Sequence, residues 1–262
     1  MSGKLVFFDI DGTLWDRQQR IPASAVEGIR RLRENGHQAF INTGRVPSYL
    51  HYDSLDALGF DGVVAACGWY IWIGGQLMRE KWITSEELKR SMAVLEKAGA
   101  MIIAEGPDYQ WYDEERLWDD TVKESFRRGL GGRGRPLESL TPTDRVTKYL
   151  ASFDQAEKAE AASRALADIF DTIYHIPTVL ELVPRGNTKA TGLRFVADYF
   201  GAPREDLYAF GDGMNDMEMI QAVGHGIAMG NGMEALKREA EYVTASLEND
   251  GILKALEHYQ LI

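Results

Sequence analysis

Short apolar runs alternate with helix-like segments at both ends of the chain, and this alternation constrains the fold more than any other feature. Near the N-terminus, the run Leu5–Phe8 precedes residues 22–36, where apolar residues recur at helical spacing, and the run Gln38–Asn42 follows. Two parallel strands need a crossover connection, which is usually a helix. Strands that alternate with helices therefore predict an α/β fold with a doubly wound, Rossmann-like parallel sheet.

The alternation changes in the middle of the chain. Residues 81–183 show helices and strands in another order, and the earlier alternation returns from residue 184 onward. The sequence thus predicts a core made of residues 1–80 and 184–262, with an inserted α+β domain of residues 81–183. The glycine-rich residues 129–136 inside the insert are expected to form a loop.

Composition and charge exclude several classes of protein. The chain of 262 residues is 45% hydrophobic and 26% charged, as is typical of a soluble globular protein with one large or two ordinary domains. The formal net charge of -11 argues against nucleic acid as a partner. No apolar run is long enough to span a bilayer and the N-terminus lacks a secretory signal, so we expect no membrane partner. The single cysteine, Cys67, permits no intrachain disulfide and fits a cytoplasmic location.

Two acidic residues follow directly after the first apolar run. Asp9 and Asp11 stand in the stretch FFDIDGTLWD, where the run indicates a buried strand and Gly12-Thr13 its exit turn. The carboxyl ends of parallel strands line the edge of the sheet at which α/β proteins bind ligands. Two like charges at that edge are unfavourable unless a cation compensates for them. The alternative is a strand that ends in a solvated aspartate turn, so the rest of the chain must supply the cation.

Three further features fall at the same predicted edge of the sheet. Thr43 follows the second strand, and its hydroxyl and neighbouring backbone N–H groups could bind an oxyanion. Lys189 begins a helix, where a cation opposes the helix dipole at a cost of about 0.3–1 kcal/mol. Asp212 and Asp216 lie on the glycine-rich loop GDGMND, and carboxylate oxygens suit a hard cation. Taken singly, Thr43 could be an ordinary turn residue and Lys189 a solvent-facing side chain.

The loop GDGMND differs from a nucleotide-binding fingerprint. Asp216 replaces the third glycine of G-x-G-x-x-G, and its carboxylate would repel a pyrophosphate. The sequence also contains no Walker loop of the form G-x-x-x-x-G-K-[ST]. A dinucleotide-binding or P-loop protein is therefore disfavoured.

Together, these side chains predict a site for phosphoryl transfer. Three carboxylates, those of Asp9, Asp11 and Asp212, form a cluster that suits Mg2+. The metal, Lys189 and the Thr43 hydroxyl would offset the charge of a bound phosphate. Positioning, electrostatic stabilisation and an in-line nucleophile are what phosphoryl transfer requires.

The same residues resemble the four motifs of the haloacid dehalogenase (HAD) superfamily of phosphatases. DIDGT at residues 9–13, NTGR at 42–45, Lys189 and GDGMND at 211–216 stand in the family's order. The tail and the position of the insertion, between the second and third motifs, are similar to the Cof-type subfamily. The resemblance implies a HAD core with an inserted α+β cap domain, and it covers the core on both sides of the insert.

The resemblance also implies a role for each motif residue. Asp9 would be the nucleophile that forms an aspartyl-phosphate, and Asp11 would be the general acid and then the general base. Thr43 and Lys189 would hold phosphate oxygens. Mg2+ would be bound by the Asp9 side chain, the main-chain carbonyl of Asp11 and Asp212.

Other residues of the same motifs would support these groups. Asp216 and Asn215 would order the waters of the metal or the phosphate, and Gly44 and Arg45 would complete the substrate-binding set. The chain departs from the subfamily pattern at Cys67-Gly68, where Asn-Gly is frequent, and in the tail, where it has Gly-Asn-Gly for Gly-Asn-Ala. Neither departure touches the four motifs.

The expected function is hydrolysis of a small phosphomonoester, such as a sugar phosphate or a phosphorylated cofactor. The alternative within enzymes is a phosphomutase, which returns the phosphoryl group to a second hydroxyl. Outside enzymes it is a receiver-like signalling module, which also uses acids, a threonine and a lysine on a doubly wound sheet. Asp11 and the insert both favour a turnover enzyme. Aromatic residues of the insert, such as Trp82 and Trp118, could contact the leaving group.

Overall fold

The computed structural model describes residues 3–16, 18–50, 58–117 and 120–262. Trp118, one of the aromatic residues expected to matter in the insert, lies outside these ranges. Within the described part of the chain, no helix is both long and apolar enough to cross a membrane.

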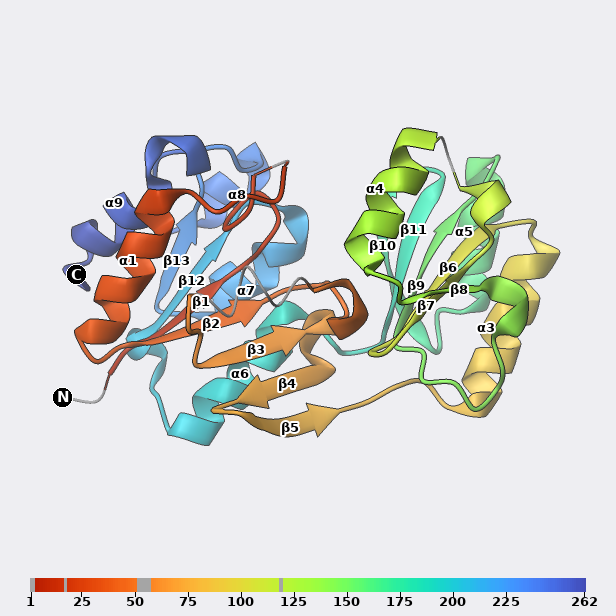
Figure 1. Cartoon of the computed structure of the whole chain (residues 1–262), viewed down its shortest axis with the longest axis horizontal. Coiled ribbons are helices and arrows are strands. Elements are labelled where there is room, and N and C mark those ends of the chain that lie inside the picture. The colour runs from red at the N-terminus through yellow and green to blue at the C-terminus, as the bar shows by residue number, and fades with distance from the viewer. Residues whose placement is uncertain (1–2, 17, 51–57, 118–119) are drawn as a thin grey trace. The chain divides into compact units, whose positions relative to one another are not determined.

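The chain divides into two compact units. The core unit comprises Met1–Gly44, Tyr52–Arg79 and Thr188–Ile262, and the cap unit comprises Arg45–His51 and Glu80–Asn187. The two units are coloured by residue number in Figure 1. The expected domain bounds at residues 80 and 183 stay a prediction about which segments fold on their own.

The core unit is built on an eight-stranded sheet with the order β14-β13-β12-β1-β2-β3-β4-β5. The six strands from β14 to β3 are parallel, and β4 pairs with β3 in the antiparallel direction. The predicted doubly wound parallel sheet is therefore confirmed. Its strands are β1 (Leu5–Phe8), β2 (Gln38–Asn42), β3 (Gly62–Ala65), β4 (Tyr70–Ile73), β5 (Gln76–Glu80), β12 (Leu207–Gly211), β13 (His225–Ala228) and β14 (Tyr242–Val243).

Helices cover both faces of this sheet, which explains why β1 is apolar throughout. All four side chains of β1 are buried, as expected for a central strand of a parallel sheet. Leu5 and Phe7 belong to a cluster with residues of α6, α7 and α8, while α1 and α9 contact each other on the opposite side (Figure 1). These helices are α1 (Ala23–Glu34), α6 (Lys189–Phe200), α7 (Met217–Ala222), α8 (Glu234–Glu239) and α9 (Gly251–His258).

The cap unit is an α+β unit with a six-stranded sheet of the order β10-β11-β9-β6-β7-β8. Its pairs are antiparallel except for β7 and β8, which are parallel. Its elements are α3 (Ser85–Lys97), β6 (Met101–Glu105), β7 (Gln110–Tyr112), α4 (Asp120–Leu130), β8 (Gly134–Pro136), β9 (Lys148–Ser152), α5 (Ala156–Ala165), β10 (Phe170–Ile176) and β11 (Val179–Pro184).

One prediction for the insert is wrong, because the glycine-rich stretch 129–136 is loop only at residues 131–133: Gly129 and Leu130 end helix α4, and Gly134–Pro136 form strand β8. Gly134 pairs with Gln110, and a Cβ at Gly134 would lie 2.8 Å from the hydroxyl oxygen of Tyr112. Glycine lets the strand approach this ring closely. Because β8 is an edge strand, Pro136 at its end removes no interior ladder hydrogen bond.

The two faces of the cap sheet carry different helices. On one face Tyr149 bonds to Ser91 of α3 at 2.8 Å and packs edge-on against Phe170. On the other face Met101 and Ile103 pack in a cluster that includes Leu130 of α4. Alternate residues of β6 and β9 thus pack in two separate apolar layers, one on each face of the sheet.

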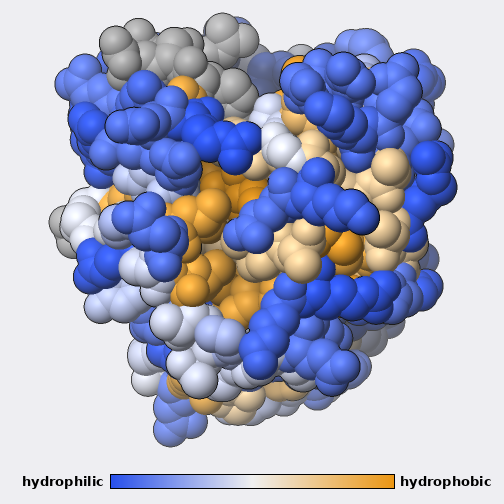
Figure 2. Space-filling model, turned by 90° about the vertical axis from the view of Figure 1, so that its right-hand side faces the viewer, coloured by the Kyte–Doolittle hydropathy of each residue, from blue (hydrophilic) through white to orange (hydrophobic). Residues whose placement is uncertain are grey.

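The helices α3 and α5 border a groove on the surface of the cap unit. Small apolar residues and two lysines line it: Val94, Lys97, Ala98, Gly99, Lys158, Ala161, Ala162 and Ala165. Figure 2 shows a face on the side of α3, with apolar side chains gathered in its middle and hydrophilic ones around them. The groove contains none of the predicted site residues.

Candidate active site

The site lies where three neighbouring strands of the core sheet end. β1 is flanked by β12 on one side and β2 on the other, so the strand order reverses at β1. Asp9 follows β1, Thr43 follows β2 and Asp212 follows β12. Ligands of doubly wound sheets bind at such a switch point, at the carboxyl ends of the strands. The topology therefore brings residues from distant parts of the sequence to one place.

Lys189 lies between two carboxylates. It is the first residue of α6, its side chain is 1% exposed, and its Nζ lies 2.6 Å from Oδ1 of Asp9 and 2.6 Å from Oδ1 of Asp216. The alternative that Lys189 faces solvent is therefore wrong. The two carboxylates compensate for a cation in the first turn of a helix, where the dipole alone would disfavour it.

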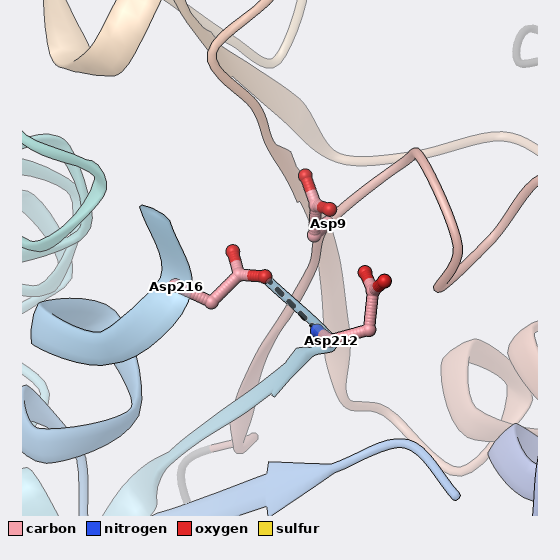
Figure 3. A group of neighbouring side chains, drawn as sticks. All are labelled: Asp9, Asp212 and Asp216. Atoms are coloured by element: carbon pink, nitrogen blue, oxygen red, sulfur yellow. Dashed lines mark hydrogen bonds between the residues drawn. The ribbon is translucent and has the colours of Figure 1, made fainter. Parts of the chain in front are cut away.

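Asp216 uses its second oxygen to shape the loop after β12. Oδ2 accepts hydrogen bonds from the backbone N–H groups of Asp212 and Gly213, both at 3.0 Å. Figure 3 shows the bond to the main-chain nitrogen of Asp212. One oxygen of Asp216 pairs with Lys189 and the other bonds to the loop backbone. Asp216 therefore holds Lys189 and the loop in a fixed arrangement.

Asp212 packs directly against the turn that follows β1. Its Oδ1 accepts a hydrogen bond from the hydroxyl of Thr13 at 3.1 Å. Gly12 has a φ of +81°, and a Cβ added there would lie 2.3 Å from Oδ2 of Asp212. Glycine is required for both reasons. Thr13 was not among the predicted site residues, although it stands in the DIDGT motif that indicated them.

The side chains of Asp9, Asp212 and Asp216 gather at these strand ends (Figure 3), with one ligand oxygen of each within 4.8 Å of the others. Lys189 contacts two of these carboxylates, and with all three ionised its ammonium would balance one of the three negative charges and leave two. A hard divalent cation with oxygen ligands, such as Mg2+, fits this donor set. The side chain of Asp11 is exposed and is not part of the group.

The electrostatics of the site favour added positive charge. Burial, and next the charge of Asp216, raise the pKa of the Asp9 carboxyl well above its usual range, against the opposing effect of Lys189. Burial and Asp216 likewise raise the pKa of Asp212 to about 6. Burial lowers the pKa of Lys189, but the charges of Asp216 and Asp9 outweigh it and raise the pKa overall. Lys189 therefore stays protonated, and a further cation beside Asp9 would counter the rise in the pKa of its carboxyl.

The backbone around Thr43 is fixed by the neighbouring strand. Thr43 is buried, its N–H donates to the carbonyl oxygen of Val64 at 2.8 Å, and its carbonyl oxygen accepts from the N–H of Cys67 at 3.2 Å. The Thr43 N–H is thus engaged within the sheet. Cys67 is buried with a φ of 53°, a left-handed conformation that asparagine adopts more readily, at the position where the sequence departs from the subfamily pattern.

The remaining predicted residues lie in different settings. Asn215 is exposed in the short 3-10 helix Met214–Asp216 of the core unit. Gly44 ends the first segment of the core unit, whereas Arg45 is grouped with the cap unit. There the Arg45 guanidinium lies over the ring of Tyr49 at 4.8 Å and donates to the carbonyl oxygen of the same residue at 3.3 Å. Substrate contacts by these residues stay a prediction.

Two asparagines near the site were missed. The side-chain amide of Asn42, 0% exposed, donates to the carbonyl oxygen of Lys189 at 2.9 Å. Asn231 donates to the carbonyl oxygen of Gly12 at 2.8 Å and accepts from the N–H of Leu247 at 2.9 Å. Asn42 belongs to the motif NTGR and Asn231 to the Gly-Asn-Gly of the tail. Only the three-dimensional structure shows which backbone groups their side chains bond to.

The fold and the site define a class of protein: a doubly wound α/β protein with aspartates and a buried lysine at the switch point of its sheet. The chain belongs to the haloacid dehalogenase-like hydrolase family, whose model matches residues 6–256. The resemblance noted from the four motifs is thereby confirmed, and the chain is an enzyme of the HAD phosphatase type.

Similar proteins agree with this family. The 5-amino-6-(5-phospho-D-ribitylamino)uracil phosphatase YitU of Bacillus subtilis (strain 168) is 29% identical over 272 residues, covering 97% of each chain. The HAD subclass IIB sugar phosphatase BT4131 has a solved structure with a TM-score of 0.83 and 29% identity, covering 99% of this chain and 100% of its own. The HAD phosphatase BT1666 from Bacteroides thetaiotaomicron gives a TM-score of 0.84 and 27% identity, covering 99% of this chain and 96% of its own.

Proposed function

We propose that the protein is a magnesium-dependent phosphatase that hydrolyses small phosphomonoesters through an aspartyl-phosphate on Asp9. The observation that carries the proposal is the buried group of Asp9, Lys189 and Asp216, in which Nζ of Lys189 lies 2.6 Å from each carboxylate. Family membership and the relatives named as phosphatases support the same reaction class.

Asp9 is the proposed nucleophile because it is buried and fixed. In the first step, a carboxylate oxygen of Asp9 bonds to phosphorus while the bond from phosphorus to the ester oxygen breaks. Asp11 gives its proton to that oxygen, so the alcohol leaves neutral. In the second step, a water oxygen bonds to phosphorus, its proton passes to Asp11 and the bond to Asp9 breaks.

Magnesium would be held by the Asp9 side chain, the main-chain carbonyl of Asp11 and the Asp212 side chain. When bound, it would supply positive charge that favours the ionised form of Asp9 and would shield the phosphate dianion from the carboxylates. Asp216 would stay behind these ligands, because its two oxygens already serve Lys189 and the loop N–H groups. Asn215 would order the bound waters or the phosphate.

The phosphate oxygens would be held by Lys189 and by the motif after β2. Lys189 is protonated and faces Asp9, so it can screen the repulsion between the nucleophile and the phosphate. The Thr43 hydroxyl and the N–H groups of Gly44 and Arg45 would complete the cradle. The N–H of Thr43 itself takes no part, because it donates to Val64.

We assign choice of the leaving group to the cap unit. The core unit carries the residues for the chemical steps, which all phosphomonoesters share, so selectivity needs groups outside it. A sugar phosphate or a phosphorylated cofactor is the proposed substrate class, in keeping with the substrates named for YitU and BT4131. A cytoplasmic setting, with available Mg2+ and reduced Cys67, suits this chemistry.

The test is phosphate release from a panel of phosphomonoesters with Mg2+, including sugar phosphates, phosphorylated cofactors and 5-amino-6-(5-phospho-D-ribitylamino)uracil. We expect turnover that stops with Asp9→Asn. A product in which the phosphoryl group has moved to another hydroxyl would show a mutase. A protein that becomes phosphorylated on Asp9 and holds the group for many minutes would instead be receiver-like.

A further inference from the structure

We infer that Asn42 is a positioning residue that fixes Lys189 in its working place, without touching the substrate. This inference rests on the proposed function, because it concerns how the phosphate-binding lysine is held. Asn42 ends β2, directly before Thr43, and its side chain is 0% exposed. It therefore acts only through the groups that it contacts.

The amide of Asn42 bonds to the main chain of Lys189 itself. Its Nδ2 lies 2.9 Å from the carbonyl oxygen of Lys189, in the first turn of α6. A hydrogen bond at this point sets how far the helix start lies from the end of β2. The direction of the Lys189 side chain toward Asp9 depends on that distance, because Lys189 is the first helical residue.

The same amide also contacts the segment that carries the second partner of Lys189. Nδ2 of Asn42 lies 3.1 Å from the sulfur of Met219, which is buried in α7. Met219 stands three residues after Asp216, whose carboxylate lies 2.6 Å from Nζ of Lys189. One buried amide group thus bridges the two helix starts that form the Lys189–Asp216 ion pair.

Keeping an amide here is costly, which argues against simple packing. Oδ1 of Asn42 is buried and has no hydrogen-bond partner among the described residues. A buried acceptor without a partner destabilises the folded state, and leucine would fill a similar volume without that penalty. A residue that breaks a local rule in this way usually serves function.

Docking of α6 against the sheet does not depend on Asn42 alone. Gly68, in the turn after β3, approaches α6 so closely that a Cβ there would lie 2.9 Å from the Cα of Gly192. This glycine contact and the apolar residues Leu193 and Val196 of α6 hold the body of the helix in place. We therefore expect variants of Asn42 to fold, with the change confined to the helix start.

The experiment replaces Asn42 with leucine and, as a smaller second change, with alanine. Ile41→Val, a buried neighbour in β2, is the matched control for a packing change. We expect kcat to fall about 10–100-fold in both Asn42 variants, because misplaced catalytic groups cost about this much, with thermal unfolding close to that of Ile41→Val. The dissociation constant for Mg2+ should change much less than kcat, since the two groups that Asn42 bonds to, the Lys189 carbonyl and the Met219 sulfur, are not metal ligands.

Inorganic phosphate then tests whether the effect passes through Lys189. Phosphate binding in the presence of Mg2+ should weaken in Asn42→Leu but, in a Lys189→Met background, the same change should have no further effect. Equal losses in both backgrounds, or variants as active as Ile41→Val, would overturn the inference. A parent protein that hydrolyses no phosphomonoester would overturn the proposed function instead, so the two failures are distinguishable.

Discussion

Oδ1 of Asp216 lies 2.6 Å from Nζ of Lys189, and the side chains of both residues are almost fully buried. A buried ion pair is weak evidence for stability, because desolvation offsets the attraction between the charges. Its value here is geometric. One carboxylate oxygen of Asp216 pairs with the ammonium of Lys189, and the other accepts hydrogen bonds that hold the loop carrying Asp212 in place.

Changing Asp216 to asparagine should separate these two tasks. The amide oxygen can still accept the loop N–H groups, but the charge opposite Lys189 is lost. We expect activity at saturating Mg2+ to fall about 10–100-fold, as is usual when the supports of a catalytic group are changed. Asp206→Asn, which removes a half-buried charge paired with Lys4, is the control and should leave kcat unchanged. Unaltered turnover in Asp216→Asn would remove this residue from the mechanism.

Magnesium binding should weaken as the pH falls below about 6. The pKa of Asp212 is raised to about 6 by burial and by Asp216 in the metal-free protein, so its carboxyl is mostly protonated below that pH and the proton competes with the metal. Titration calorimetry with Mg2+ at several pH values measures the effect.

Removal of the metal by a chelator should abolish activity, and Ca2+ should restore it poorly because its coordination is larger and looser. Full activity in chelator would contradict the metal assignment.

The sequence indicated that Asp9, Asp212 and Lys189 lie close together, because each one stands in a short motif beside a clear strand or helix start. Asp9, Asp212 and Lys189 are separated by most of the chain, yet the doubly wound topology brings strand ends together and the structure gathers them. Asn42 was missed because its role depends on a bond to Lys189, which is 147 residues away. No local pattern indicates such a contact.

The predicted fold failed at one element for a different reason. Composition marked residues 129–136 as loop, but pairing with Gln110–Tyr112 makes a strand of Gly134–Pro136. Tertiary pairing overrides a poor strand propensity at a sheet edge, where glycine and proline are tolerated. The short strand forms one edge of the cap sheet.

A buried ion network in the cap unit should make its stability depend on pH. Oε1 of Glu181 lies 2.8 Å from Nζ of Lys148. Burial raises the pKa of Glu181, but Lys148 and His175 outweigh it and lower the pKa to about 2. Because the folded pKa lies below the unfolded value, Glu181 stabilises the fold above about pH 4.5, and this contribution is lost as the pH falls toward 2.

Urea unfolding of Glu181→Gln and of the parent at several pH values tests this. We expect a difference in the free energy of unfolding of about 3 kcal/mol near neutral pH, shrinking as the pH falls from 4.5. Glu160→Gln is the control, since the exposed pair of Glu160 with Arg164 should contribute little at any pH. A constant difference across the range would mean that Glu181 is not held by its charge.

Removal of the insert should leave a folded core. All strands of the eight-stranded sheet lie within residues 5–80 and 207–243, outside the segment 81–183. We expect a chain with residues 81–183 replaced by a short linker to unfold cooperatively and to bind Mg2+ nearly as the parent does. It should lose discrimination among phosphomonoesters more than metal affinity. A trimmed chain that cannot fold would show that the predicted domain bounds are wrong.

Replacement of Asp11 should distinguish an enzyme from a signalling module. Its side chain is exposed, unlike that of Asp9, which is 4% exposed, so solvent has access to it. Asn at position 11 keeps the shape but neither gives nor takes a proton. General acid–base catalysis typically raises the rate by about 10²–10⁴-fold, so the turnover rate of Asp11→Asn should fall by at least that order.

An activated substrate should reveal which of the two chemical steps is slowed more in Asp11→Asn. With p-nitrophenyl phosphate the leaving group needs little protonation, so the first step survives better than the second, and phosphate accumulates on Asp9. Intact-protein mass spectrometry after a rapid acid quench measures this species, with Asp9→Asn as the unlabelled control. Turnover of Asp11→Asn at the parent rate would exclude Asp11 from proton transfer. A parent that retains phosphate for many minutes would favour the receiver-like alternative.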